Sequence, residues 1–283
     1  MGFQLRFDRL ATLFLVHPLT RAFWNGVGNH VPILMYHDVS DLPERAPHPY
    51  FQTNTDPATF RLQMEWLVEN GYRAIPLAKI EEELARPAGE SGKSFVITFD
   101  DGFRSFREHA SPVLKRFGFP ATVFLATGYI GRRFMNKECL AWGEVRELQA
   151  EGIEFGSHTV SHPRLHGMAW ASIRNEIGRS KTAIEDATGK PARLFSFPYA
   201  FPQEDREFVD HLGRALKNCG YSLGVTTMIG TAAPGEDSMF LKRIPVNMHD
   251  DGTLFRAKLE GGYDWLRAPQ YLFRVLKRWF PGK

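Results

Sequence analysis

Two short polar motifs contain the side chains best suited to chemistry. Thr98-Phe99-Asp100-Asp101-Gly102 closes an apolar run. Adjacent carboxylates at a strand end point in different directions, so one could bind a cation while the other stays free. Gly102 permits a sharp turn into a following helix. The same residues would also suit an Asp-Gly turn that caps a helix, so this motif alone leaves both interpretations open.

The second motif is His158-Thr159-Val160-Ser161-His162. Its histidines stand at positions i and i+4, which face one side of a helical turn, so both imidazoles could reach one ion. Alone, the pair could equally be incidental histidines in a polar loop. With an aspartate from another strand end, it completes a His-His-carboxylate set that leaves positions open for water and substrate. The combination favours a catalytic divalent metal, best Zn²⁺, although Co²⁺, Ni²⁺ and Fe²⁺ use similar ligands.

The elements that must position these motifs follow from the pattern of apolar residues. Short apolar runs predict strands at residues 31–36, 72–76, 94–99, 122–126, 153–156, 194–197, 223–227 and 241–246. The patterns between them predict a loop at 38–55 and helices at 57–70, 77–85, 104–116, 142–150, 169–187 and 205–217. Such alternation predicts a parallel sheet, either open or closed as a barrel. Because chemistry in these folds lies at the carboxyl ends of the strands, both motifs and Pro198-Tyr199 should meet there.

The composition bounds the class of protein. A chain of 283 residues can bury one large core, and 43% hydrophobic with 24% charged residues is typical of a soluble globular protein. The formal net charge of +3 is too small to indicate a nucleic-acid partner, so none is expected. Cys139 and Cys219 lie far apart without CxxC spacing, which favours two free thiols in a reducing compartment.

The N-terminal residues have only a faint likeness to a signal peptide. The apolar run 11–16 follows Arg6 and Arg9, but it meets His17 and Pro18 without a small-residue cleavage site. No run approaches the roughly 20 apolar residues that cross a bilayer. We therefore expect a protein of the cytoplasm or of the inner face of the membrane.

The sequence around the motifs resembles that of a known family. The two motifs stand about sixty residues apart and are accompanied by PILMYHD, GFPATVFL, FSFPYA and GYSLGVTT. Over roughly residues 30–250 the chain thus resembles the polysaccharide deacetylases, which have a NodB-homology domain. The resemblance implies an α/β fold, namely a distorted (β/α) barrel with fewer than eight strands.

The resemblance also implies a role for each motif residue. Asp101, His158 and His162 would bind the metal, and Asp100 would be the general base that takes a proton from water. The backbone N–H of Tyr199 would bind the oxyanion. Hydrogen bonds from two hydroxyl side chains could orient the metal ligands, namely those of Thr159 and Ser161.

Two features depart from the family pattern. Many members carry an arginine in the third motif that pairs with the base, but Ser196 stands at that position here. Without that charge we expect the pKa of Asp100 to be lowered less. The family's Asp-x-x-Asp-Trp is also missing after Val225-Thr226-Thr227. The chain therefore resembles most the branch whose first strand ends in Tyr-His-Asp, which includes enzymes acting on biofilm and exopolysaccharide chains.

A general acid must protonate the leaving amine, and histidine suits that task. Two histidines end apolar strands, His37 in ILMYHD and His249 in PVNMHD. In the Tyr-His-Asp branch the acid appears at the N-terminal position, so the resemblance favours His37. Either residue could instead be a strand-end histidine with a satisfied hydrogen bond. His48 and His166 lie in proline-containing loops and are interpreted as surface residues.

The two ends of the chain differ from the rest. We divide the sequence into an amphipathic N-terminal segment (1–29), a catalytic domain (30–262) and a basic amphipathic C-terminal segment (263–283). From Trp265 onward there are five basic residues and no acidic one, interleaved with aromatic and aliphatic side chains. Such a helix could lie at a membrane interface. It could equally cap the barrel with its basic side chains in solvent.

The sequence therefore predicts a metal-dependent hydrolase that removes N-acetyl groups from an N-acetylated glycan or glycan precursor. A hydrolase of the same fold that acts on a non-sugar amide or a formamide is the first alternative. A carbohydrate-binding pseudoenzyme is less suited to the residues, because a binder does not need a free base beside a metal triad. A membrane-surface scaffold would depend on the termini alone.

Overall fold

Seven parallel strands close into a barrel in the computed structural model, which describes residues 6–23, 29–42, 44, 46, 48–87 and 93–279. Neighbours around the barrel pair in the order β1-β12-β11-β10-β9-β6-β5, and β5 pairs back with β1. The short strand β4 (Arg73–Ala74) adds to the edge of β5. The barrel strands are β1 (Ile33–Tyr36), β5 (Ser94–Phe99), β6 (Thr122–Leu125), β9 (Glu154–Ser157), β10 (Leu194–Ser196), β11 (Leu223–Ile229) and β12 (Leu241–Pro245).

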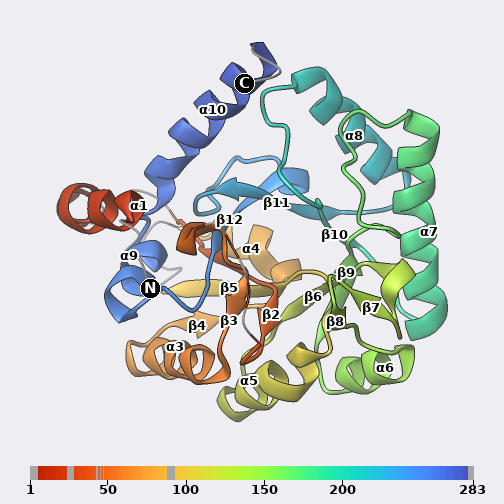
Figure 1. The fold of residues 1–283 in the computed structure, drawn as a ribbon, viewed down its shortest axis with the longest axis horizontal. Coiled ribbons are helices and arrows are strands. Elements are labelled where there is room, and N and C mark those ends of the chain that lie inside the picture. The colour runs from red at the N-terminus through yellow and green to blue at the C-terminus, as the bar shows by residue number, and fades with distance from the viewer. Residues whose placement is uncertain are drawn as a thin grey trace.

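Helices surround this barrel (Figure 1). They follow the strands in the alternation that the sequence predicts. Their bounds are α3 (Pro57–Glu69), α4 (Ile80–Leu84), α5 (Ser111–Phe117), α6 (Trp142–Ala150), α7 (Trp170–Thr188), α8 (Arg206–Asn218) and α9 (Gly252–Leu259). Short pairs of strands flank the barrel mouth, namely β2 (Asp38–Val39) with β3 (Asn54–Thr55) and β7 (Arg133–Phe134) with β8 (Lys137–Glu138).

Burial on both faces explains why β5 is apolar throughout. Every residue of β5 is buried. Phe95, Ile97 and Phe99 belong to the large core cluster that includes side chains of α3 and α5, whereas Val96 belongs to a second cluster. Because side chains alternate along a strand, Thr98 and Asp100 face the same side as Val96.

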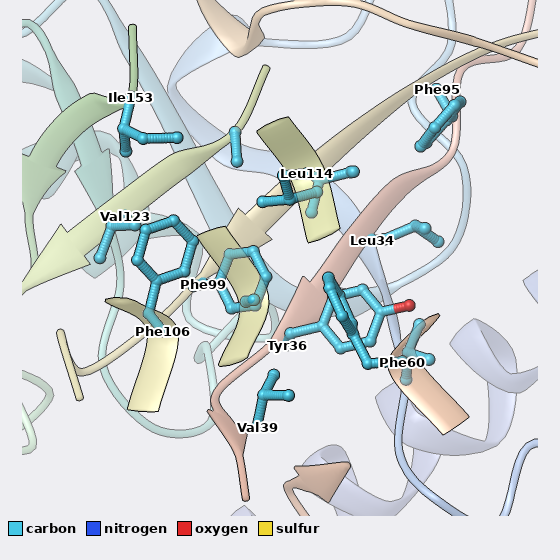
Figure 2. Packing of buried hydrophobic residues seen from close by; sticks show 14 of the residues in the cluster. Leu34, Tyr36, Val39, Phe60, Phe95, Phe99, Phe106, Leu114, Val123 and Ile153 are labelled. Atoms are coloured by element: carbon cyan, nitrogen blue, oxygen red, sulfur yellow. The ribbon is translucent and has the colours of Figure 1, made fainter. Parts of the chain in front are cut away.

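Aromatic packing fixes the ends of the two strands that lead into the candidate site. Tyr36 ends β1 and Phe99 ends β5, and their rings stack with centroids 5.4 Å apart. Phe60 of α3 meets the edge of Tyr36, and Phe106 meets Phe99 at 4.7 Å (Figure 2). The Tyr36 hydroxyl donates to Oε1 of Gln63. The next residues, His37 and Asp100, therefore leave the strands from a rigid base.

Both terminal segments described here are helical. The N-terminal one runs through α1 (Phe7–Ala11), a π-helical turn (Thr12–Val16) and α2 (His17–Phe23). The C-terminal one is α10 (Arg267–Trp279). Their treatment as units separate from residues 30–262 stays a prediction. No described helix is long and apolar enough to cross a membrane.

Most predicted elements are confirmed within a residue or two. The strand 94–99 and the helix 142–150 have the predicted bounds, and Asp56 caps α3 by accepting a hydrogen bond from the Thr59 amide. The loop 38–55 was wrong in part, because it contains β2 and β3. The helix 104–116 instead starts with a π-helical turn (Phe106–Ala110), which passes into α5 next to Pro112, a residue without an N–H to donate.

A close approach of three strands in the barrel gives a stability prediction. A Cβ at Gly156 of β9 would lie 2.6 Å from the Phe124 ring and 2.8 Å from the Leu194 carbonyl oxygen. Gly156→Ala should therefore destabilise the protein by about 1–3 kcal/mol in urea unfolding, since the core must move to accept it. Gly143→Ala in α6 is the control, because nothing lies within 4 Å of its Cβ position. Equal midpoints for the two variants would contradict this packing.

Candidate metal centre and active site

Three ligand atoms converge at the carboxyl ends of β5 and β9. Nε2 of His162 lies 3.1 Å from Nε2 of His158, and these atoms lie 3.4 Å and 3.6 Å from Oδ1 of Asp101. All three residues are buried. Ligands at about 2.0–2.2 Å around a tetrahedral ion are themselves about 3.4 Å apart, which these spacings match.

Hydrogen bonding within this group fits a cation. Oδ1 of Asp101 is buried and accepts no hydrogen bond from any described residue. Such an atom is costly unless something else satisfies it. Nδ1 of His158 lies 2.8 Å from the backbone oxygen of Ser196, so this nitrogen carries the proton and Nε2 presents its lone pair. The residues present therefore fit a divalent metal ion.

The histidine loop reaches this geometry without a helix. Residues 158–162 form no helical turn, and Thr159 and His162 have positive φ values of 68° and 52°. The prediction that i and i+4 spacing places both rings on a helical face was therefore wrong in its geometry. The convergence of the two rings is nevertheless confirmed, because the left-handed residues bend the loop back on itself.

Glu176 of α7 holds this loop in place. Its Oε2 accepts hydrogen bonds from the backbone N–H groups of Val160 and Ser161, both at 2.9 Å. Its Oε1 accepts one from the Ser161 hydroxyl at 2.8 Å. Thr159 contributes differently, since its hydroxyl accepts from the His162 amide. These two hydroxyl groups thus fix the backbone that carries the imidazoles rather than the imidazoles themselves.

Burial sets the charge state of the three ligands. It lowers the pKa of His158 to about 4 and that of His162 to about 3. Burial and the neighbouring Asp100 carboxylate raise the pKa of Asp101. The positive charges of the protein near Asp101 are thus too weak to balance a negative charge on its carboxylate. A bound cation would supply that charge and release the proton.

Arg243 of β12 pairs with Asp100 in the barrel interior. Two parallel hydrogen bonds of 2.8 Å and 2.7 Å join Nη1 and Nη2 to the two carboxylate oxygens. The remaining N–H groups of Arg243 donate to three further oxygens, those of Thr98 Oγ1, Ser196 Oγ and the Thr226 carbonyl. All five guanidinium donors are therefore used, in a side chain that is fully buried.

The pair between Arg243 and Asp100 corrects the expectation that, with Ser196 in place of an arginine, the pKa of Asp100 would be lowered less. Burial alone would raise the pKa of Asp100, but the charge and hydrogen bonds of Arg243 outweigh it and hold that pKa well below its usual range. The arginine that the third motif lacks thus comes from a strand later in the sequence. Ser196 remains part of the arrangement, since its hydroxyl lies 3.1 Å from Oδ1 of Asp100.

Of the two candidate acids, only His37 borders Asp100. Nε2 of His37 lies 4.0 Å from Oδ2 of Asp100, and burial lowers the pKa of His37 to about 4. The described contacts of His249 are elsewhere: its amide donates to Asn247 and its carbonyl accepts from Arg6. His166 lies at the surface as expected, whereas Nδ1 of His48 accepts a backbone hydrogen bond from Tyr50.

Tyr199 lies against the candidate ligand His162, where the third motif predicts it. Its ring is 4.5 Å from that of His162, and its backbone has a positive φ of 57°. The Thr227 hydroxyl holds this turn by donating to the Tyr199 carbonyl. Within the described residues the backbone N–H of Tyr199 makes no hydrogen bond, so it is available to an oxyanion.

Three residues around the site were missed from the sequence. Arg243 could have been found, because a charged residue inside a predicted buried strand requires a partner. Glu176 gives no such signal, since acidic residues are common on helices. Lys137 comes from the β7–β8 hairpin and pairs with Asp38 at 2.9 Å beside the barrel mouth. Both cysteines are free, as expected.

Comparisons with known proteins agree with this geometry. Residues 88–223 match the family model described as Polysaccharide deacetylase. The protein YxkH of Bacillus subtilis (strain 168) is 30% identical over 231 residues, which are 81% of this chain and 76% of YxkH. A poly-beta-1,6-N-acetyl-D-glucosamine N-deacetylase of Staphylococcus aureus (strain MSSA476) is 25% identical over 199 residues, which are 66% of each chain.

Solved structures share the fold. Streptococcus pyogenes deacetylase PplD in complex with acetate superposes with a TM-score of 0.69 at 23% identity, over 81% of this chain and 98% of PplD. IcaB from Ammonifex degensii gives the same TM-score and identity, over 82% of this chain and 98% of IcaB. The prediction of a distorted (β/α) barrel with fewer than eight strands is confirmed.

The Arg243–Asp100 pair gives a second stability prediction. Arg243→Met leaves a buried carboxylate without its counter-charge, which should cost about 3–5 kcal/mol in urea unfolding. Arg61→Met removes an exposed pair with Glu65 and should cost less than about 1 kcal/mol. The double variant Arg243→Met/Asp100→Asn should recover part of the loss, because the remaining side chain is neutral. If Arg243→Met behaves like Arg61→Met, the buried pair is not the constraint described here.

Proposed function

We propose that this chain, which belongs to the polysaccharide deacetylase family, uses a divalent metal ion to remove N-acetyl groups from an N-acetylated glycan. Family membership makes it a hydrolase of carbon–nitrogen bonds. The observation that carries the proposal is one arrangement: a carboxylate held ionised, Asp100, stands directly beside three converging ligand atoms. A base next to a metal site is what hydrolysis of an amide requires.

Asp101, His158 and His162 would hold the ion. The chemistry that such an ion supplies when bound is polarisation of the acetyl carbonyl and a lower pKa for a water molecule. Two imidazoles and one carboxylate are a ligand set of catalytic zinc sites, so we propose Zn²⁺. The hydrogen bond from Nδ1 of His158 to Ser196 keeps that ring in the required tautomer.

Asp100 takes the proton of the attacking water. The bidentate pair with Arg243 fixes the direction of its carboxylate and keeps it ionised at neutral pH. The free N–H of Tyr199 donates to the oxygen of the acetyl group as negative charge develops there. His37, which burial keeps neutral at rest, receives the proton that Asp100 has taken from the water and gives it to the leaving amine; its position 4.0 Å from Asp100 supports this role over His249.

The substrate class is supported by the relatives. The staphylococcal protein is named as an N-deacetylase of poly-beta-1,6-N-acetyl-D-glucosamine, which is an N-acetylated glycan. Here the same chemistry would need an acetyl group at the barrel mouth and a sugar amine as the leaving group. We therefore propose an N-acetylglucosamine-containing glycan as the substrate of this chain.

Acetate release and metal content, measured on the same samples, test this proposal. The parent protein should carry about one metal ion and release acetate from poly-N-acetylglucosamine. Asp101→Ala, His158→Ala and His162→Ala should each lose both. Asp100→Asn should keep the metal, since Asp100 is proposed not to bind it, yet lose about 10²–10⁴-fold in rate. Metal retained in all three ligand variants, or acetate released by Asp100→Asn at the parental rate, would refute the assigned roles.

The role of His37 is tested with two substrates. An N-acetyl sugar has an amine leaving group that must be protonated, whereas an activated acetyl ester has a phenolate that departs unaided. His37→Ala should therefore slow the amide at least about tenfold more than the ester, while His249→Ala, the matched control, stays near the parent on both. The reverse pattern would move the role to His249, and equal slowing of both substrates would exclude both histidines.

A further inference from the structure

The N-terminal helical segment exposes apolar side chains to solvent and turns polar side chains toward the protein. A surface helix of a globular protein normally turns its apolar side chains inward and its polar ones to solvent. Here two of the inward side chains are polar, beside Leu13, which packs against the core: Asp8 accepts from the Tyr263 hydroxyl and Thr12 accepts from the Trp265 indole. The outward side chains are apolar, with Phe7 72% and Phe14 71% exposed. The segment is anchored by its polar side and leaves its apolar side uncovered.

Helix α10 shows the same inversion. Gln270 points at the barrel, where its side-chain amide donates to the Thr227 carbonyl and accepts from the Ile229 amide. The adjacent Leu272 and Phe273 are 57% and 67% exposed. Both terminal segments thus present apolar side chains that no described part of the chain covers.

The two segments lie on the same side of the molecule. The hydrogen bond from Trp265 to Thr12 joins them two residues before α10 begins. Figure 1 shows α10 leaving the barrel on the side where α1 lies. We call their exposed apolar side chains together the terminal apolar face, which consists of Phe7, Leu10, Phe14, Leu15, Leu19, Tyr271, Leu272, Phe273 and Leu276.

The sequence of the C-terminal part of this face is basic. The sequence from Trp265 onward has five basic residues and no acidic one, and Arg267 at the start of α10 is exposed. The acidic groups that lie along the N-terminal segment are paired: Asp8 with Arg6, Asp251 with Arg9, and Glu260 with His17. Arg267 and Arg274 of α10 thus add positive charge beside these apolar side chains, and Glu204 is an acidic neighbour of Arg274.

We propose that the terminal apolar face lies in the interface of an anionic lipid bilayer and holds the enzyme on a membrane surface. Apolar side chains would enter the acyl boundary while the basic residues meet anionic headgroups. A second copy of the chain fits the face less well, because pairing two such faces brings basic residues of the same sign together. No described helix can span the bilayer, so the association is with its surface.

Co-sedimentation with vesicles tests the proposal on the full chain. The parent should bind vesicles of phosphatidylglycerol and phosphatidylcholine at least about tenfold more tightly than vesicles of phosphatidylcholine alone. Binding to the anionic vesicles should weaken as salt rises from about 0.05 M to about 0.5 M, since screening shortens the reach of the basic residues. Vesicle binding is measured without any catalytic assay, so its failure is distinguishable from a failure of the proposed function.

Three substitutions locate the contact. Phe14→Asp and Leu272→Asp should each weaken binding to anionic vesicles at least about tenfold, and the double variant should abolish it. Leu62→Asp on α3 is the matched control, because Leu62 is 57% exposed like Leu272 but lies outside the terminal apolar face. It should bind as the parent does. Circular dichroism and metal content should be the same in the parent and in all four variants.

Two results would overturn the proposal. One is that the parent binds neither kind of vesicle, or that the Phe14→Asp and Leu272→Asp variants bind anionic vesicles as well as the Leu62→Asp control does. The other is that the parent does not bind vesicles and is a dimer in light scattering, whereas the Phe14→Asp and Leu272→Asp variants are monomers. That second result would assign the face to contact between copies of the chain.

Discussion

The bidentate pair between Arg243 and Asp100 is the interaction on which the site depends. A buried ion pair seldom stabilises a fold more than apolar packing would, because both charges lose their hydration. Here the guanidinium on β12 uses all five donors on oxygens at the end of β5 and in β10 and β11, so it fixes four strands relative to one another. Ser196 extends the effect, since its hydroxyl joins this network and its carbonyl orients His158. Asp100 and His158 are thus aligned through one residue.

Two adjacent aspartates acquire opposite properties from this arrangement. Both are buried, and burial raises the pKa of each. Arg243 reverses the effect at Asp100, whereas Asp101 faces two histidines whose own pKa values burial has lowered. The same residue type is therefore held ionised in one position and lacks a balancing charge in the next, as the proposed roles of base and metal ligand require. Environment, rather than sequence, separates the two roles.

The sequence predicted the elements with the strongest local signals. Residues 94–99 are β-branched or aromatic almost throughout, and Asp56-Pro57 carries both a cap and a proline suited to a first turn, so both predictions succeed. The convergence of Asp101, His158 and His162 was predicted from the rule that parallel strands end at one edge of the sheet. The histidine loop was misjudged because its shape depends on Glu176, a contact made across 15 residues. The β7–β8 hairpin was missed because Met135-Asn136 lacks the usual glycine of a two-residue turn.

The backbone around Asp101, His158 and His162 has a consequence for ligand binding. Of the six described non-glycine residues with positive φ, four lie at the site: Asp101, Thr159, His162 and Tyr199. Such conformations are unfavourable by about 1–3 kcal/mol each and persist only where neighbours impose them, here through Glu176 and Thr227. The loss of conformational entropy is therefore completed during folding rather than on binding. An ion or an acetyl group bound as proposed would meet a preorganised backbone that needs no further ordering.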